Sequence, residues 1–252
     1  MLRSLLTCVC LLLGAYALDP TNTFEYEYHV VAKMVEFDLF KAETAMKVAA
    51  LENQLQMTQK TLRSVSREQS GSTYIRWGKK TCPNITTTSQ VYSGQAAGGH
   101  YQHTGSAEYI CLPIDPEYDT PAVEDKEQQG RSLICGAEYE TNSGTLFGHL
   151  HDRDVPCSLC YTRGKTTVML PARTSCYSGW TLEYRGFLMS SEANQPGKNY
   201  VCVDNDPEEM NESHANKNGA LLYLVEAREG SFGKNPYKPG WELSCAVCST
   251  TF

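Results

Sequence analysis

The chain has 252 residues, of which 41% are hydrophobic and 20% charged, and its formal net charge is −7 at pH 7. This length allows one or two ordinary globular domains. The acidic balance, together with a sequence that has no dense cluster of Lys and Arg, argues against nucleic acid and against an anionic membrane surface as the partner.

Residues 1–17 have the pattern of a secretory signal peptide. The basic Arg3 is followed by an apolar run from Leu5 to Gly14 and by Ala15-Tyr-Ala17, an Ala-x-Ala cleavage signal. About ten apolar residues are too few to cross a membrane core, which needs roughly 20. We therefore expect the mature protein to be secreted and extracellular.

Residues 24–70 are predicted to form a helical coiled-coil stalk. Between Phe24 and Glu68 there is no Pro or Gly, and residues that favour helices are frequent. Positions spaced alternately four and three residues apart, from Val30 to Val65, are apolar at 8 of 11 places, which indicates a heptad seam. The alternative is a helix that folds back on its own domain, but a helix of roughly 65 Å is too long for one face to be buried that way. Ser70-Gly-Ser72 is predicted to end the helix and to act as a short linker.

Residues 73–252 are predicted to be a β-rich domain made of two tandem halves, 73–164 and 165–252, so that the fold class is α+β. Each half has four cysteines, separated by 29, 46 and 3 positions in the first half and by 26, 43 and 3 in the second. Other features repeat in the same order, among them Tyr92-Ser-Gly94 with Tyr184-Arg-Gly186. A repeated period of this kind indicates a tandem duplication.

In a secreted protein, cysteines at repeated spacings predict disulfides. The eight cysteines assigned in this way are Cys82, Cys111, Cys157, Cys160, Cys176, Cys202, Cys245 and Cys248. If each half closes on itself, three connectivities per half are possible, and the sequence does not choose among them. Zinc or redox chemistry at the two Cys-x-x-Cys pairs is the less favoured interpretation. Cys135 is left over, and is either an interchain bridge or an unpaired, buried small residue.

Two sequons, at Asn84 and Asn211, predict N-glycosylation and a surface position. The segment from Pro116 to Gly130 is acidic and is expected to be an exposed loop. Trp180 and Trp241 are expected to be core aromatic residues, and a sugar-stacking surface is the alternative.

No metal or cofactor is expected, although several residues are of the types that bind metals. His100 and His103 form one group, and His149 and His151 would share a face if they lay on a strand. Asp204 and Asp206 belong to an oxygen-rich loop that could hold calcium, but Asp-Pro is also a common start of a turn. The sequence contains no motif of a catalytic triad or a phosphate loop, so an enzyme is not expected.

Further motifs follow one another in order along residues 73–250: Tyr74-Ile-Arg-Trp-Gly-Lys-Lys-Thr-Cys-Pro83, Tyr92-Ser-Gly-Gln-Ala-Ala-Gly-Gly-His-Tyr-Gln-His-Thr-Gly105, Tyr109-Ile-Cys-Leu-Pro113, Asn216-Lys-Asn-Gly-Ala-Leu-Leu-Tyr-Leu-Val-Glu226 and Gly240-Trp-Glu-Leu-Ser-Cys-Ala-Val-Cys248. Together they resemble the C-terminal non-collagenous domain of short-chain, spongin-type collagens of invertebrates. The resemblance implies an extracellular, trimeric protein of the matrix. Two features depart from that family's pattern: there is no Gly-X-Y run, so no collagen triple helix can form, and Glu229-Gly-Ser-Phe-Gly-Lys234 stands where the family has Cys-Gly-Ser-x-x-Cys.

These features predict a secreted, glycosylated, non-enzymatic protein with matrix or attachment function, held as a homotrimer by residues 24–70. Its partners would be other copies of itself and matrix components or glycans. The alternative is a soluble, multivalent recognition or defence protein with lectin-like binding, in which several copies on one stalk raise weak contacts to useful avidity.

Overall fold

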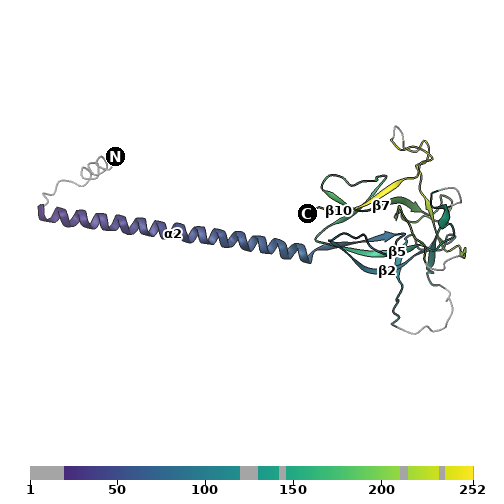
Figure 1. Cartoon of the computed structure of the whole chain (residues 1–252), viewed down its shortest axis with the longest axis horizontal. Coiled ribbons are helices and arrows are strands. Elements are labelled where there is room, and N and C mark those ends of the chain that lie inside the picture. Colours follow the sequence, from purple (N-terminus) through teal and green to yellow (C-terminus); the bar gives the residue numbers. More distant parts are fainter. Residues whose placement is uncertain (1–19, 120–129, 142–145, 211–214, 233–235, 252) are drawn as a thin grey trace. The chain divides into compact units, whose positions relative to one another are not determined.

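The computed structural model describes residues 20–119, 130–141, 146–210, 215–232 and 236–251. The predicted signal peptide lies outside the described residues. The chain divides into two compact units, Met1–Arg63 and Ser64–Phe252. One long helix precedes a β-rich domain with four disulfides, which confirms the α+β class (Figure 1).

Helix α2 runs from Pro20 to Gln69, 50 residues, or about 75 Å at 1.5 Å per residue. It starts four residues before the predicted Phe24, because Pro is well suited to a first helical turn. The hydroxyls of Thr44 and Thr58, two polar positions of the seam, donate to the carbonyls of Phe40 and Gln54 one turn earlier. Among the described residues, no helix has the length and apolar character to span a membrane.

The apolar side chains of α2 are exposed. Leu51 is 64% exposed and Leu55 58%, and the seam positions Val30, Met34, Phe37, Val48, Leu62 and Val65 are exposed as well. Polar pairs on the helix are local, such as Lys33 with Glu36 at 2.8 Å and Glu43 with Lys47 at 2.7 Å. Along the described part of α2, these apolar side chains are therefore not covered by other residues of the helix.

The β-rich unit contains ten described strands and one 3₁₀ turn. Their bounds are β1 Gly71–Trp77, β2 Thr88–Gly98, β3 Ile110–Pro113, β4 Cys135–Tyr139, η1 Gly148–Leu150, β5 Pro156–Arg163, β6 Thr167–Pro171, β7 Trp180–Ser190, β8 Val201–Asp204, β9 Ala220–Leu224 and β10 Ser244–Thr250. The predicted linker is wrong in part: Gly71 and Ser72 belong to β1, where the Ser72 hydroxyl lies 3.0 Å from that of Thr167.

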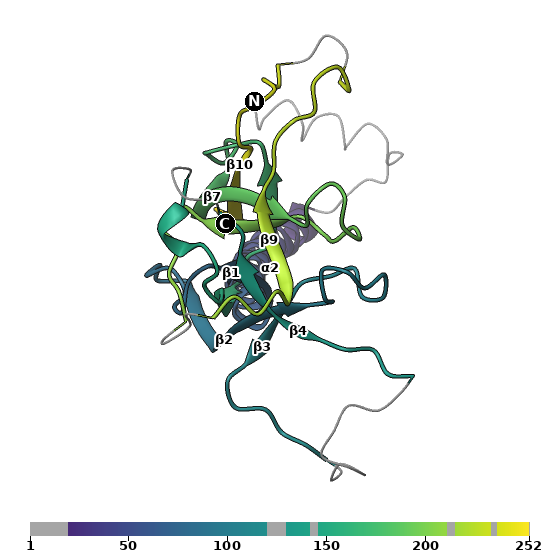
Figure 2. The same ribbon diagram turned by 90° about the vertical axis from the view of Figure 1, so that its right-hand side faces the viewer.

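The first five strands and the last five pair in the same relative order. Strand β5 lies between β1 and β2, with β3 and β4 also paired to β2. Strand β10 lies between β6 and β7, with β8 and β9 also paired to β7. Each set also has a register shift at the residue before a tyrosine, at Val91 before Tyr92 and at Glu183 before Tyr184. Figure 2 shows β1 to β4 in the lower part of the domain and β7, β9 and β10 above them.

Two parallel contacts join the sets of strands. Trp77 of β1 pairs with Val203 of β8, and Ala137–Tyr139 of β4 pair with Ala220–Leu222 of β9. Because β9 also pairs with β7, the path of strands closes on itself.

The buried core draws on both sets of strands. The larger hydrophobic cluster contains Trp77 and Tyr139 from the first set and Met189, Val203 and Leu222 from the second. The smaller one likewise combines Tyr74 with residues of β7 and β10. Residues 73–252 are thus one folding unit with a shared core, not two separate domains.

The disulfides follow one rule in both sets of strands: the first cysteine bonds the fourth, and the second bonds the third. The bridges are Cys82–Cys160, Cys111–Cys157, Cys176–Cys248 and Cys202–Cys245. Each Cys-x-x-Cys pair therefore sends its sulfurs to two different partners, which rules out the zinc and redox interpretations of these motifs. A glycine is required at two matched positions of β2 and β7, because a Cβ at Gly94 or Gly186 would lie 2.1 or 1.6 Å from the carbonyl oxygen of the residue that follows the second cysteine.

Candidate functional site

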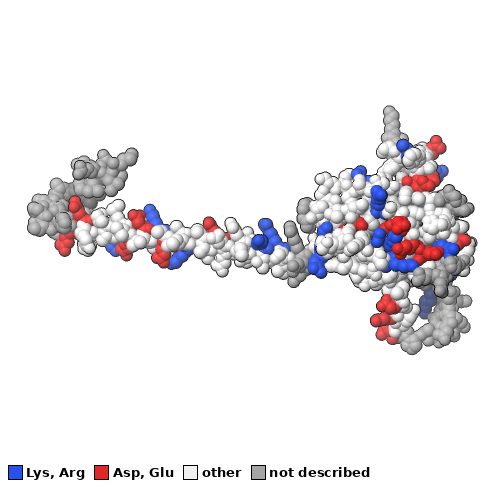
Figure 3. All heavy atoms as spheres, viewed as in Figure 1, with Lys and Arg blue, Asp and Glu red and all other residues white. Residues whose placement is uncertain are grey.

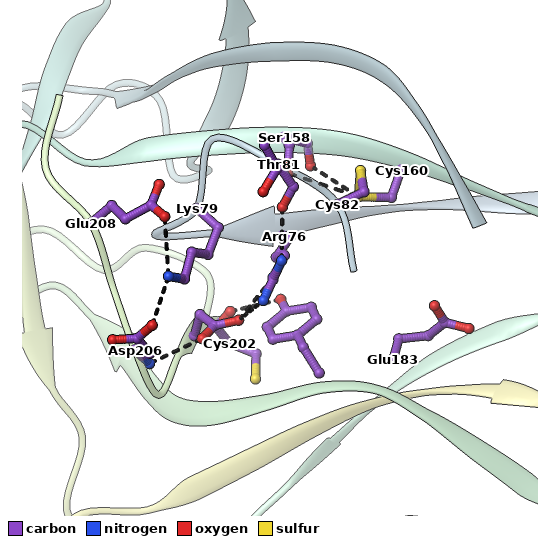
Figure 4. A network of polar contacts seen from close by, with 12 residues as sticks. Arg76, Lys79, Thr81, Cys82, Ser158, Cys160, Glu183, Cys202, Asp206 and Glu208 are labelled. Atoms are coloured by element: carbon purple, nitrogen blue, oxygen red, sulfur yellow. Dashed lines mark hydrogen bonds and ion pairs between the residues drawn. A yellow bond between two sulfur atoms is a disulfide. The ribbon is translucent and has the colours of Figure 1, made fainter. Parts of the chain in front are cut away.

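A buried ion pair joins β1 to β8 (Figure 4). The Nε and Nη2 atoms of Arg76 each lie 2.8 Å from Oδ2 of Asp204, and Nη1 donates to the carbonyl of Thr81. The Asp204 side chain is only 3% exposed, and the Arg76 guanidinium also lies 5.8 Å from the ring of Tyr184. Because Arg76 lies on β1 and Asp204 on β8, this hydrogen-bonded pair is a structural link between the two sets of strands.

Lys79 extends this network to the loop after β8. Its ammonium lies 2.9 Å from Asp206 and 3.1 Å from Glu208. Burial would lower the pKa of Lys79, but the hydrogen bonds to these two carboxylates outweigh it and raise the pKa above its ordinary value. The same ammonium lowers the pKa of Asp206.

The oxygen-rich loop is therefore part of a turn held by protein cations. Asp204 binds Arg76 through one carboxylate oxygen and accepts the N–H of Asp206 through the other, as turn aspartates commonly do. Asp206 is paired with Lys79. These contacts occupy the two candidate calcium ligands, so the turn is the better interpretation of this loop.

A second buried carboxylate connects the first and second sets of strands. Glu183, at the bulge in β7, accepts hydrogen bonds from the hydroxyls of Tyr74, Thr88 and Ser249 at 3.0, 2.8 and 2.6 Å. Burial, and then the charge of Glu183, raise the pKa of Tyr74 far above its ordinary value, so this hydroxyl remains a donor. The sequence offers no signal for this cluster beyond a glutamate within a strand.

The histidines do not lie on strands. His149 is in the 3₁₀ turn η1 and His151 follows it, so the condition under which the two would share a strand face is not met. His149 is exposed, whereas His151 lies beside Glu140 and Asp152. No sequence pattern connects Glu140 with His151, which lies 11 positions later in the chain.

His100 and His103 lie in a loop, with ring centroids 4.7 Å apart. His100 and the unpaired Cys135 both line a hollow of about 630 Å³. Lys217 and Asp154 line the same hollow and form an ion pair of 2.7 Å, and the hollow is otherwise mainly apolar. Cys135 is half-buried at the start of β4.

Trp241 is not a core residue: it is 62% exposed, while Trp77 takes the core position. It lines a groove of about 500 Å³ together with Tyr177 and Tyr237. Cationic groups accompany the rings, with Lys238 Nζ 4.5 Å from the centroid of Trp241 and the Arg173 guanidinium 4.2 Å from that of Tyr177. Exposed rings beside charged hydrogen-bonding groups can pack against the C–H face of a sugar while binding its hydroxyls. Trp180 is half-buried.

The predicted surface features fall partly outside the described residues. Asn84 is exposed in the loop after Cys82, as a glycosylation site needs to be, whereas Asn211 is not among the described positions. Of the predicted acidic loop, Pro116–Asp119 and Gly130 are exposed. Figure 3 shows acidic and basic side chains next to one another at the centre of the visible face of the domain.

No protein-family model matches this chain. Its function is accordingly inferred from the helix, the disulfide framework and the groove at Trp241.

Proposed function

We propose that the protein is a secreted, non-enzymatic protein of the extracellular matrix or of attachment, which self-associates through residues 24–70. The observation that carries this proposal is the exposed apolar seam of α2. An isolated helix with such a seam is unfavourable in water, and a second copy of the same helix covers it at matching heptad positions.

The size of the seam supports stable association. Eight apolar positions, from Val30 to Val65, would each contribute about 1.5 kcal/mol or more when buried, so the gain is on the order of 10 kcal/mol per chain. The loss of translational freedom offsets a part of it. The polar seam positions Lys41, Thr44 and Thr58 lower the gain without interrupting the helix. The resemblance to short-chain collagens favours three copies.

The matched order of strand pairing, the matched disulfides and the matched bulges support a tandem duplication behind residues 73–164 and 165–252. The hydroxyl of Tyr92 also donates to the carbonyl of Cys111 at 2.7 Å, and that of Tyr184 lies 2.7 Å from the carbonyl of Cys202. Four disulfides suit a protein that works outside the cell, where thiols are oxidised. Each closes a loop of 43 to 78 residues and contributes about 4 kcal/mol in the chain-entropy model.

Retention in extracellular matrix tests the proposal. Purified protein is applied to a decellularised extracellular-matrix preparation and washed with salt and detergent. The proposal predicts retention, and weaker retention for a Leu51→Asp/Leu55→Asp variant whose helices separate. Free elution of the parent protein would contradict the matrix function.

A second function, lectin-like recognition, is favoured by the groove at Trp241. It predicts binding to arrays of glycans or to microbial surfaces, and at least a tenfold loss of binding in a Trp241→Ala variant, with Trp180→Phe as a control. Binding that does not depend on Trp241 would contradict this groove as the site. Because several copies act together, the loss should be larger in the oligomer than in the separated chains.

A further inference from the structure

Three side chains of metal-binding type meet where β4 ends. Glu140 follows the last residue of β4, and His151 and Asp152 follow the turn η1. One ligand atom from each of the three lies within 4.8 Å of the other two, and all three side chains are partly buried. The group is thus a mixed histidine and carboxylate cluster, drawn from two segments of the chain.

The distances in this cluster are too long for hydrogen bonds. Nδ1 of His151 lies 3.6 Å from Oε2 of Glu140, and Nε2 of His151 lies 3.7 Å from Oδ1 of Asp152. In a tetrahedral site with bonds of about 2.1 Å, neighbouring ligand atoms are about 3.4 Å apart. The spacing between Oε2 of Glu140 and Nδ1 of His151 is therefore close to that of two ligands of one metal ion. Oδ1 of Asp152 lies beside Nε2, the other ring nitrogen, so it joins an ion at Nδ1 only after its side chain has rotated.

Two of the ligand atoms are buried and have no hydrogen-bond partner among the described residues: Nδ1 of His151 and Oδ1 of Asp152. Buried polar atoms are nearly always satisfied, because leaving one unpaired costs about 1–3 kcal/mol. Negative charge is also concentrated here, because the carboxylates of Glu140 and Asp152 both lie within 4 Å of the His151 ring. A cation would satisfy both atoms and neutralise this charge.

The backbone holds the ligands in place. The N–H of Asp152 donates to the carbonyl of Tyr139, and the N–H of Tyr139 donates to the carbonyl of Arg153, each at 3.0 Å. Asp152 itself has φ of 60°, a left-handed conformation that aspartate tolerates better than most residues. The N–H of Glu140 donates to Leu222 of β9 at 2.9 Å, so the cluster lies at the contact between the first and second sets of strands.

We propose that Glu140, His151 and Asp152 form a binding site for a divalent transition metal ion, of which Zn²⁺ is the chemical type that best fits one imidazole and two carboxylates. Three protein ligands leave a position for water or an external ligand. His151 is 36% exposed, which gives the ion a path from solvent. Binding would connect the end of β4 to the turn η1 and stabilise the domain. Ca²⁺ and Mg²⁺ fit less well, because they prefer oxygen ligands throughout.

The test is a titration of the full, disulfide-intact chain with Zn²⁺ after removal of metals by EDTA and dialysis. We expect one Zn²⁺ per chain at this cluster by calorimetry, a rise in the melting temperature that grows with the Zn²⁺ concentration, and weak or no effect of Ca²⁺. Co²⁺ should give a visible absorption band when it occupies the same site. Absence of Zn²⁺ binding by the parent protein would overturn the proposal.

Variants localise the site. His151→Ala, Glu140→Gln and Asp152→Asn should each lower Zn²⁺ affinity by tenfold or more, and asparagine keeps the left-handed backbone accessible at position 152. His149→Ala removes an exposed histidine of the same turn and should bind as the parent does, as should His100→Ala/His103→Ala. Near-ultraviolet circular dichroism shows that each variant is folded. Binding that survives His151→Ala, or that disappears with either control, would contradict the site.

Discussion

The ion pair between Arg76 and Asp204 gives a sharp test of how the β-rich domain is held together. Replacing Arg76 by Met keeps most of the side-chain volume but removes three N–H contacts of 2.8 Å, two to Asp204 and one to the Thr81 carbonyl. The Asp204 carboxylate, 3% exposed, then remains buried without its cation.

Breaking a buried pair from one side costs about 3–5 kcal/mol. For a domain of this size that corresponds to a fall in the melting temperature of roughly 6–20 °C. Adding Asp204→Asn to Arg76→Met should recover part of the loss, because an amide still accepts the N–H of Asp206 and carries no charge.

Thermal and urea unfolding followed by tryptophan fluorescence measures these effects, since Trp77 is buried beside the pair. Arg185→Met is the matched control, because Arg185 is exposed on β7 and its loss should change stability by less than about 0.5 kcal/mol. A loss below about 1 kcal/mol for Arg76→Met, or a double variant less stable than Arg76→Met alone, would refute the reasoning.

Three other predictions concern charge, core and thiol. Burial would raise the pKa of Glu208, but the N–H of Lys80 and the ammonium of Lys79 outweigh burial and lower the pKa. The stability that the ionised Glu208 carboxylate contributes is therefore present above about pH 4.5 and is lost as the pH falls through the pKa of the folded state. Glu208→Gln should therefore lower the free energy of unfolding by about 0.5–1 kcal/mol at pH 7 after solvent screening. In urea unfolding at several pH values, the difference in stability between variant and parent should shrink as the pH falls. A difference that grows in acid would contradict the direction of this pKa shift. Residues 73–164 expressed alone should lack the near-ultraviolet circular dichroism of a fixed core, because that core needs side chains of the second set of strands. A cooperative thermal unfolding transition of this fragment would show that the first set folds without the second. Cys135→Ser should leave the oligomer unchanged on gel filtration and non-reducing gels, since the helix carries association, and its dissociation would identify Cys135 as the crosslink.

The sequence predicted the features that depend on local pattern. A long segment without Pro or Gly specifies α2, and its end was placed within one residue, at Gln69. The repeated cysteine spacings anticipated that each set of strands would have its own bridges, yet they could not select the connectivity, which depends on how β3, β5, β8 and β10 are arranged in space.

Contacts between distant segments were not predictable. The pairing of β4 with β9, which makes one core out of two similar sets of strands, has no counterpart in any local pattern. Trp241 was placed in the core because tryptophan is usually buried, but its loop lies at the surface, where Lys238 covers one side of the ring. The proximity of Glu140 to His151 depends on a backbone turn with two left-handed residues, Phe147 and Asp152, which residue types alone do not specify.

Self-association is tested most directly by the molar mass of the full, disulfide-intact chain in solution, determined by light scattering and sedimentation equilibrium under reducing and non-reducing conditions. If three copies associate through residues 24–70, the parent protein has three times the mass of one chain in both conditions, and the Leu51→Asp/Leu55→Asp variant has the mass of one chain. A single-chain mass for the parent protein at micromolar concentration would contradict self-association, because the exposed seam of α2 would then have no partner.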